Sequence, residues 1–328
     1  MKRIKNKISL IVFVIFLFNY IWSFNYISSN TIMSVNNKIT RKVNPIGRTV
    51  GLKLYTNGVL VVGMSEIEDE NGDKLKPYEN TGIKEGDLIK SINGMELKNV
   101  SELIEIVNNS NGNDVSVKYE RNDDEVYTTI KPARIDDKKY MLGLWVRDAA
   151  AGIGTLTFYE EATSNFAALG HGIEDIDTGS ILNISNGEIV TSKIISIVKG
   201  KANKPGEIRG TIDEGKKVGK ISTNNDLGVY GKVTNFDYVN SVKLDEVEVA
   251  NREQIQIGKA KIICQLSNDG VEEFDIEIKK IYKNNYKDNK SMLIKVCDDK
   301  LIEKTGGIIP RNEWNSNNTR GENNWCYY

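Results

Sequence analysis

Short stretches of alternating apolar and polar residues follow one another through this 328-residue chain, separated by turns rich in glycine, asparagine and aspartate. No long helical period interrupts them in the second half of the sequence. Strands at such short spacing are typical of sandwiches and barrels. The sequence therefore predicts a mainly β protein, built as a barrel or as paired sheets. The segments that carry this prediction are 141–148, 152–159, 181–184, 187–190, 194–198, 246–250, 258–264, 273–278 and 292–296.

The N-terminal segment has a different character. Basic residues up to Lys7 precede a run from Ile8 to Phe24 that is apolar apart from Asn19 and Ser23. This run is close to the ~20 residues that cross a bilayer, and positive charge before it keeps that end in the cytoplasm. No small-x-small cleavage site follows, as a signal peptide would have. We expect a single-pass anchor in residues 1–29, a polar linker in 30–44, and the remainder outside the cytoplasm.

Composition excludes several classes of function. The 44 basic and 45 acidic residues are nearly balanced, and no basic patch indicates nucleic-acid binding. The three cysteines, Cys264, Cys297 and Cys326, are widely spaced and odd in number. They form neither a disulfide framework nor a zinc-ligand spacing. We expect no metal and no cofactor.

The first globular region begins near Pro45. Thr49 to Leu54 alternates, and Thr56-Asn57-Gly58 predicts a hairpin turn after it. The segment 81–97 reads Thr-Gly-Ile-Lys-Glu-Gly-Asp-Leu-Ile-Lys-Ser-Ile-Asn-Gly-Met-Glu-Leu, with a tight turn at Asn93-Gly94. A helix is predicted from Asn99 onward, and alternating strands at 115–119 and 126–130 complete the unit.

Residues 45–134 strongly resemble a PDZ domain of the kind found in bacterial proteases. The resemblance implies that a peptide end adds as a strand beside Gly51, Leu52, Lys53 and Leu54. An alternative of equal weight is a PDZ fold that serves only as a spacer or as an autoinhibitory lid.

His171 is the single histidine of the chain and lies in the segment Ala167-Ala168-Leu169-Gly170-His171-Gly172-Ile173. Histidine is the one side chain that titrates near neutral pH without perturbation, so His171 is the first candidate for acid–base chemistry. On residue type alone, a histidine packed in a glycine-bounded turn is the simpler interpretation.

The sequence from residue 135 onward resembles the SpoIVB-type sporulation signalling serine peptidases. The order of anchor, PDZ domain and peptidase domain is also theirs, and the resemblance extends to Ile309. It implies a trypsin-like β-barrel peptidase domain in residues 135–309. The motifs that carry the resemblance are 155–159, 168–173, 177–179, 205–210 (Pro-Gly-Glu-Ile-Arg-Gly) and 303–309 (Glu-Lys-Thr-Gly-Gly-Ile-Ile).

The resemblance implies a His-Asp-Ser mechanism in that chain order. A serine hydroxyl is a poor nucleophile until an imidazole accepts its proton, and a carboxylate must hold that imidazole in the correct tautomer. His171 matches the family's histidine and Asp298 its aspartate, with Asp299 as the alternative. Asp175 and Asp177 lie nearer to His171 in sequence, but such proximity does not set triad geometry.

The serine that should follow is absent. The family continues after Gly-Gly-Ile-Ile/Val with Gln-Gly-Met-Ser-Gly-x-Pro, whereas residues 310–328 here form a polar, asparagine-rich tail. Codons for this tail, read one base later, permit Gln-Gly-Met-Ser-Gly in succession from Pro310. We therefore predict that residues 310–328 are out of frame, that the nucleophile belongs at the position of Glu313, and that the last strands of the barrel are missing or garbled.

The resemblance implies an exported, membrane-anchored serine endopeptidase of the forespore intermembrane space. It would cleave itself and then a regulator of a membrane-embedded protease complex, while its PDZ domain binds peptide ends. Because the nucleophile is absent, we expect the chain as written to be inactive. The alternative is a non-catalytic PDZ-containing binding protein with a dead peptidase fold.

Overall fold

A computed structural model describes residues 41–69, 71–201, 204, 206–282 and 291–307, together with the backbone of 325–327. The predicted anchor in residues 1–29, most of the linker and the position of Glu313 lie outside these ranges. None of the helices in the described part of the chain has the length and apolar content that a membrane crossing needs.

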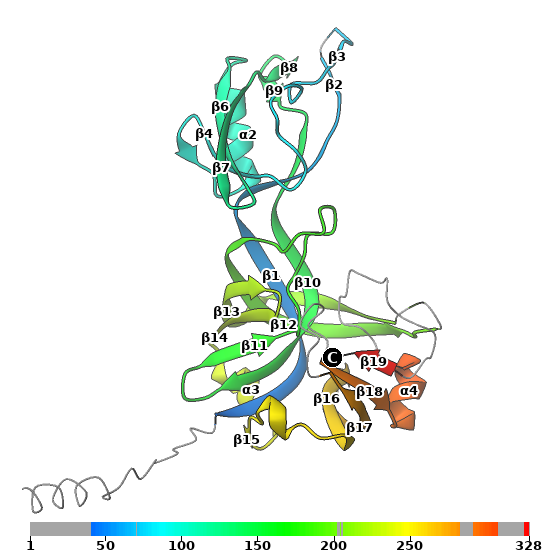
Figure 1. Cartoon of the computed structure of the whole chain (residues 1–328). Coiled ribbons are helices and arrows are strands. Elements are labelled where there is room, and N and C mark those ends of the chain that lie inside the picture. Colours follow the sequence, from blue (N-terminus) through cyan, green and yellow to red (C-terminus); the bar gives the residue numbers. More distant parts are fainter. Residues whose placement is uncertain are drawn as a thin grey trace, which may run out of the picture. The chain divides into compact units, whose positions relative to one another are not determined.

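Two long strands, β1 (Lys42–Met64) and β10 (Leu144–Glu160), run antiparallel along most of their length (Figure 1). The hairpin predicted at Thr56-Asn57-Gly58 is wrong, because β1 continues through it with a shift of register between Tyr55 and Leu60. Thr56 Oγ1 donates to the carbonyl oxygens of Gly58 (2.6 Å) and Asp148 (3.0 Å), so the irregular backbone groups have partners without a chain reversal.

Six strands pair one after another in the order β1, β10, β11, β14, β13 and β12. Because β12 pairs with β1 in turn, the six strands form a circuit. The strands added to β1 and β10 are β11 (Asn165–Ala168), β12 (Ile184–Val198), β13 (Glu207–Asn225) and β14 (Gly228–Val233). Alternate residues of β1, namely Val50, Leu52 and Leu54, are buried in the core that this circuit shares with the short helix α3 (Phe236–Asn240). The prediction of a mainly β protein is confirmed, and the trypsin-like barrel stays a prediction.

Between β1 and β10 the chain forms a second core. Asn99 caps helix α2 (Val100–Asn109) by accepting from Glu102 N, and Leu103 and Val107 are buried. The turn at Asn93 and Gly94 also forms as predicted, with φ of 52° and 76°. The other elements here are β2 (Ile67–Glu68), β3 (Lys74–Leu75), β4 (Leu88–Ile92), β5 (Met95–Glu96), β6 (Val115–Arg121), β7 (Asp124–Ile130), β8 (Ala133–Asp136) and β9 (Lys139–Met141).

The C-terminal part contributes a four-stranded sheet in the order β16, β17, β18 and β19. Three residues of the predicted out-of-frame tail form β19 (Trp325–Tyr327), which pairs with β18 (Met292–Val296). Helix α4 (Asp299–Thr305) follows β18 directly. The remaining elements are β15 (Val247–Glu248), η1 (Arg252–Gln254), β16 (Gly258–Ser267) and β17 (Gly270–Ile281).

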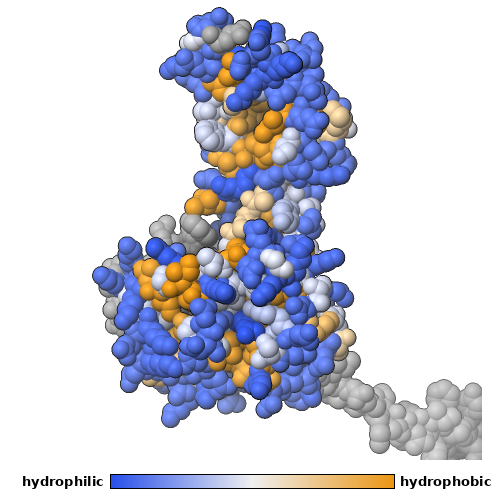
Figure 2. Space-filling view, turned by 180° about the vertical axis from the view of Figure 1, so that it is seen from behind, coloured by the Kyte–Doolittle hydropathy of each residue, from blue (hydrophilic) through white to orange (hydrophobic). Residues whose placement is uncertain are grey.

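The surface is mostly hydrophilic, with several separate apolar patches on the face shown in Figure 2. Large apolar side chains that are more than half exposed include those of Trp145, Ile195, Leu227 and Ile257.

Candidate active site

His171 lies in the loop that follows β11, and this strand is held on both sides. β11 pairs with β10 through Leu156 and Ala168, and with β14 through Ala168 and Val229. Phe166 and Ala168 are buried, so the sheet fixes the point at which the loop begins. On β10, where Tyr159 pairs with Phe166, burial raises the pKa of the Tyr159 phenol above its ordinary value near 10.

The backbone is strained at Leu169, two residues before His171. Leu169 has a φ of 62°, a left-handed conformation that side chains other than glycine adopt rarely. Its amide donates to Thr155 O (3.0 Å), and its carbonyl accepts from Thr157 Oγ1 (3.3 Å). Strained residues of this kind persist where the surroundings determine the conformation, and they concentrate at functional sites.

The ring of His171 is half-buried, and its Nδ1 lies 2.8 Å from the carbonyl oxygen of Gly172. A carbonyl oxygen can only accept, so Nδ1 carries a proton, and in the neutral imidazole the lone pair is then on Nε2. That tautomer is the one a general base needs for proton transfer at Nε2.

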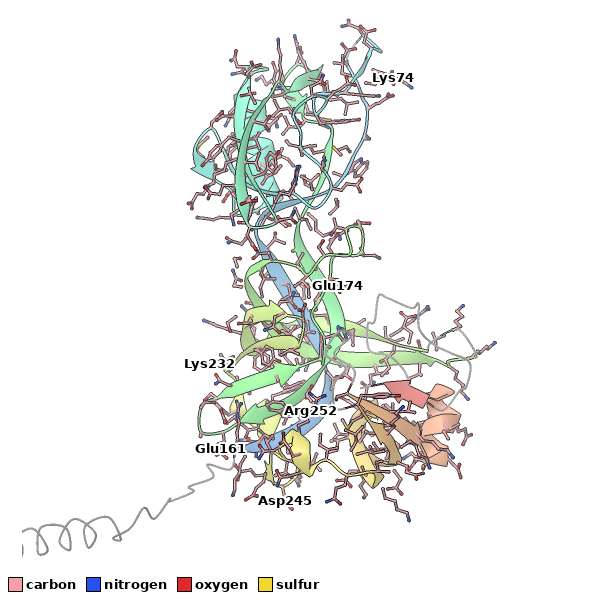
Figure 3. All side chains as sticks on the ribbon, viewed as in Figure 1. Lys74, Glu161, Glu174, Lys232, Asp245 and Arg252 are labelled. Carbon is pink, nitrogen blue, oxygen red and sulfur yellow. The ribbon has the colours of Figure 1, made fainter. Side chains whose placement is uncertain are left out.

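After His171 the loop is anchored on β13 and on β10. Asn224 Oδ1 accepts from Ile173 N, and Asn224 Nδ2 donates to Ile173 O, both at 2.8 Å. Farther along, Arg147 of β10 contacts two loop carboxylates, with Nη1 2.5 Å from Asp175 Oδ2 and Nη2 2.8 Å from Asp177 Oδ2. Glu174, labelled in Figure 3, lies in the same loop, where its backbone forms an isolated antiparallel β-bridge with Ile181.

Asp298 lies at the start of α4, where its Oδ1 accepts from Leu301 N at 3.0 Å. It is half-buried, whereas the neighbouring Asp299 is exposed and lies in the first turn of the helix. The hydrogen bonds described for the Asp298 and His171 side chains go to separate partners. The structure therefore places both residues in defined positions without showing a contact between them.

The segment before the predicted nucleophile is packed against the loop between β12 and β13. Thr305 is buried, and its carbonyl accepts from Gly200 N at 2.8 Å. Gly306 ends α4 with a φ of 73°, and a Cβ there would lie 2.3 Å from Gly200 O. Only glycine fits this close contact in that conformation.

The predicted peptide-binding residues Gly51, Leu52, Lys53 and Leu54 do not border an open strand edge. They pair with residues 150–153 of β10 on one side and with residues 187–190 of β12 on the other. Leu52 and Leu54 are buried in the core of the circuit, and Lys53 pairs with Glu214 at 2.7 Å. The prediction of peptide binding there is wrong, because neighbouring strands occupy both edges.

The sequence patterns did not predict that Arg147, Asp175 and Asp177 form a cluster. Asp175 and Asp177 stand out as part of an acidic run, but Arg147 lies 28 residues before Asp175, and only the sheet brings the two together. In the described part of the chain, no group of three or more His, Cys, Asp or Glu side chains is arranged to hold a metal ion.

The profile of the family described as SpoIVB peptidase S55 matches residues 138–311, more than half of the chain. The chain belongs to the SpoIVB peptidase S55 family. Membership implies a serine peptidase, and His171 and Asp298 both lie in the matched region. A PDZ domain is matched at residues 58–131, a narrower range than the predicted 45–134.

Two further matches cover parts of this S55 peptidase. The zinc metalloprotease RasP of Shouchella clausii is 31% identical over 130 residues, which are 37% of this chain and 30% of RasP. The chain thus spans less than a third of that relative. The crystal structure of the PDZ domain of the SdrC-like protein from Listeria monocytogenes is 25% identical, with a TM-score of 0.22, and the match covers 27% of this chain and 87% of that one.

Proposed function

We propose that this protein is an exported, membrane-anchored serine endopeptidase with a trypsin-like mechanism, in which His171 is the general base. The observation that carries the proposal is the placement of the single histidine within the S55 match, with its Nδ1 hydrogen-bonded to a carbonyl oxygen. In this arrangement Nε2 accepts the proton of a serine hydroxyl and later returns it to the leaving amine.

Asp298 is the proposed orienting carboxylate. Capping of α4 uses Oδ1 alone, and a carboxylate has two oxygens and about four acceptor positions. In the active enzyme Oδ2 would accept from Nδ1 of His171 in place of the Gly172 carbonyl. The negative charge would then stabilise the imidazolium that forms during acylation.

The nucleophile belongs at position 313, outside the described residues. With Glu313 at that position the chain cannot form an acyl-serine, so we propose that it is inactive as written and that the true frame restores Gln-Gly-Met-Ser-Gly from residue 310. Determination of the nucleotide sequence across codons 305–328 tests the frame directly. A reading in which no alternate frame encodes Gln-Gly-Met-Ser-Gly would refute the frameshift.

In the repaired frame, the proposed activity is self-cleavage followed by cleavage of a protein at a membrane, a regulator of a membrane-embedded protease complex. This would take place in the forespore intermembrane space during sporulation, with the PDZ domain binding peptide or protein ends. The support for these roles is family membership together with the PDZ match.

Self-processing of the repaired protein tests the catalytic assignment. We expect processed fragments from the repaired protein, and none from its His171→Ala variant or from the chain as written. Ser180→Ala is a matched control on the same loop and should process normally. Processing by the chain as written, or by the His171→Ala variant, would contradict the proposal.

A second function is favoured by one observation, the glutamate at position 313. If the frame proves to be as written, the protein would be a PDZ-containing binding protein with a dead peptidase fold.

A further inference from the structure

The PDZ region, residues 58–131, has a strand edge of the kind to which peptides add, and the chain's own β10 occupies this edge. The end of β1 pairs with β4 on one side, through Val59 with Ile89 and Leu60 with Leu88. On its other side it pairs with β10, through Val61 with Val146 and Met64 with Leu144. PDZ domains bind extended peptides by adding them as a strand to such an edge.

The β10 segment also makes the side-chain contacts of a bound peptide. Leu144 and Val146 pack against the core of the PDZ region, whereas the intervening Trp145 is 63% exposed. Asp148, at the end of this segment, accepts through Oδ2 from the amide of Val100, the first residue of α2, at 2.7 Å. The PDZ match ends at residue 131, so this segment comes from outside the matched domain.

Arg147 of the same segment contacts the loop that carries His171. Its partner Asp175 has a side chain that is 1% exposed, and Asp175 Oδ1 accepts from the amides of Asp177 and Thr178, both at 3.0 Å. The amide of Asp175 donates to Ser180 O, and Gly179 N donates to Asp175 O. A buried carboxylate needs its counter-charge, so Arg147 keeps these turns in place.

We propose that residues 144–148 are a built-in ligand of the PDZ domain and that Arg147, within this ligand, is a positioning residue for the His171 loop. This rests on the proposed function, because the loop matters to catalysis only if His171 is the base. Displacement of the segment by another peptide would remove Arg147 from Asp175 and Asp177 and release the loop. The state of the PDZ edge is thereby transmitted to the peptidase site.

Hydrogen exchange of the full chain tests the contact between Arg147 and the loop. Arg147→Gln should speed exchange at the amides of Asp177 and Thr178 by about tenfold, because it leaves the Asp175 carboxylate buried without its counter-charge. Arg147→Lys keeps the charge and should restore protection to within about threefold of the parent.

Arg121→Gln is a matched control. The Arg121 side chain is 32% exposed and pairs with Asp87, which is 1% exposed, and Arg147 and Asp175 have the same two exposures. Removal of Arg121 should weaken the PDZ region but leave the amides of Asp177 and Thr178 protected. Equal loss of protection in both glutamine variants would show a general loss of stability and would overturn the positioning role.

Addition of a labelled synthetic peptide with the sequence of residues 142–149 tests the built-in ligand. The parent chain should show no saturable binding, and Val146→Asp, which disfavours packing of the internal segment, should bind the peptide and lose loop protection. Saturable binding by the parent, or unchanged loop protection in Val146→Asp, would overturn the proposal. Should Val146→Asp fail to fold, the exchange test with Arg147→Gln still decides the coupling. Neither readout needs peptidase activity, so this inference and the proposed function can fail separately.

Discussion

The carboxylate of Asp298 caps α4 and has a proposed second role in catalysis, and one substitution can separate the two. As the N-cap of α4 it accepts from Leu301 N and holds the helix that leads to Thr305 and Gly306. As the proposed orienting residue it would hold the His171 ring. Capping needs only an acceptor oxygen, whereas the catalytic role needs a negative charge.

We therefore predict that Asp298→Asn in the repaired protein retains the free energy of unfolding to within about 0.5 kcal/mol, because asparagine caps helices as well as aspartate does. Its peptidase activity should fall by about 10⁴-fold, because the carboxylate that fixes the imidazole tautomer is gone. Urea unfolding and a cleavage assay measure the two effects.

Two further variants complete this test. Asp298→Ala should lose the activity and, in addition, about 1 kcal/mol of stability with the cap. Asp299→Asn is the control and should leave activity unchanged. If Asp299→Asn were inactive and Asp298→Asn active, Asp299 and not Asp298 would be the orienting carboxylate.

At the level of elements, close backbone packing in the sheet determines where His171 lies. β14 supports β11, and at Gly231 of β14 an added Cβ would lie 1.9 Å from Lys220 O of β13. Relief of such a clash requires the backbone of one of the two strands to shift. The position of the His171 loop thus depends on a glycine distant from it in sequence.

Gly231→Ala should lower the free energy of unfolding by about 1–3 kcal/mol, the cost of overpacking in a close-packed interior. Gly215→Ala is the matched control, because its Cβ would meet only Asp213 Oδ1 at 3.7 Å. That variant should differ from the parent by no more than about 0.5 kcal/mol. Denaturant titration of both variants checks the difference, and equal midpoints would contradict this account of the packing.

Local signals predicted several elements correctly, and long-range pairing explains the errors. The helix that starts at Asn99 and the turn at Asn93-Gly94 depend on a few neighbouring residues, and both form as predicted. Thr56-Asn57-Gly58 carries an equally good turn signal, but two distant strands, β10 and β12, pair along β1 and keep it extended. The cluster of Arg147 with Asp175 and Asp177 has the same long-range origin.

For the whole molecule, the main consequence of the fold is that the PDZ region lies between two paired strands of the peptidase circuit. The chain runs into the PDZ region along β1 and out of it along β10, and both strands are also part of the sheet that supports His171 (Figure 1). The predicted boundary at residue 45 assigns the first half of β1 to the PDZ domain, whereas those residues pair with β10 and β12. Local motifs predicted the family, but they did not predict that β1 and β10 are shared by the PDZ domain and the peptidase circuit.

Reaction with a fluorophosphonate tests the central claim most directly, because the reagent labels a serine that a base has activated. The serine oxygen forms a bond to phosphorus, fluoride leaves, and the base takes the serine proton. In the frame-repaired protein, mass spectrometry should find a single adduct on the serine that replaces Glu313. The His171→Ala variant of the repaired protein and the chain as written should remain unlabelled. Labelling of another serine, or of the His171→Ala variant at the same rate, would contradict the assignment of His171 as the base of an S55 serine peptidase.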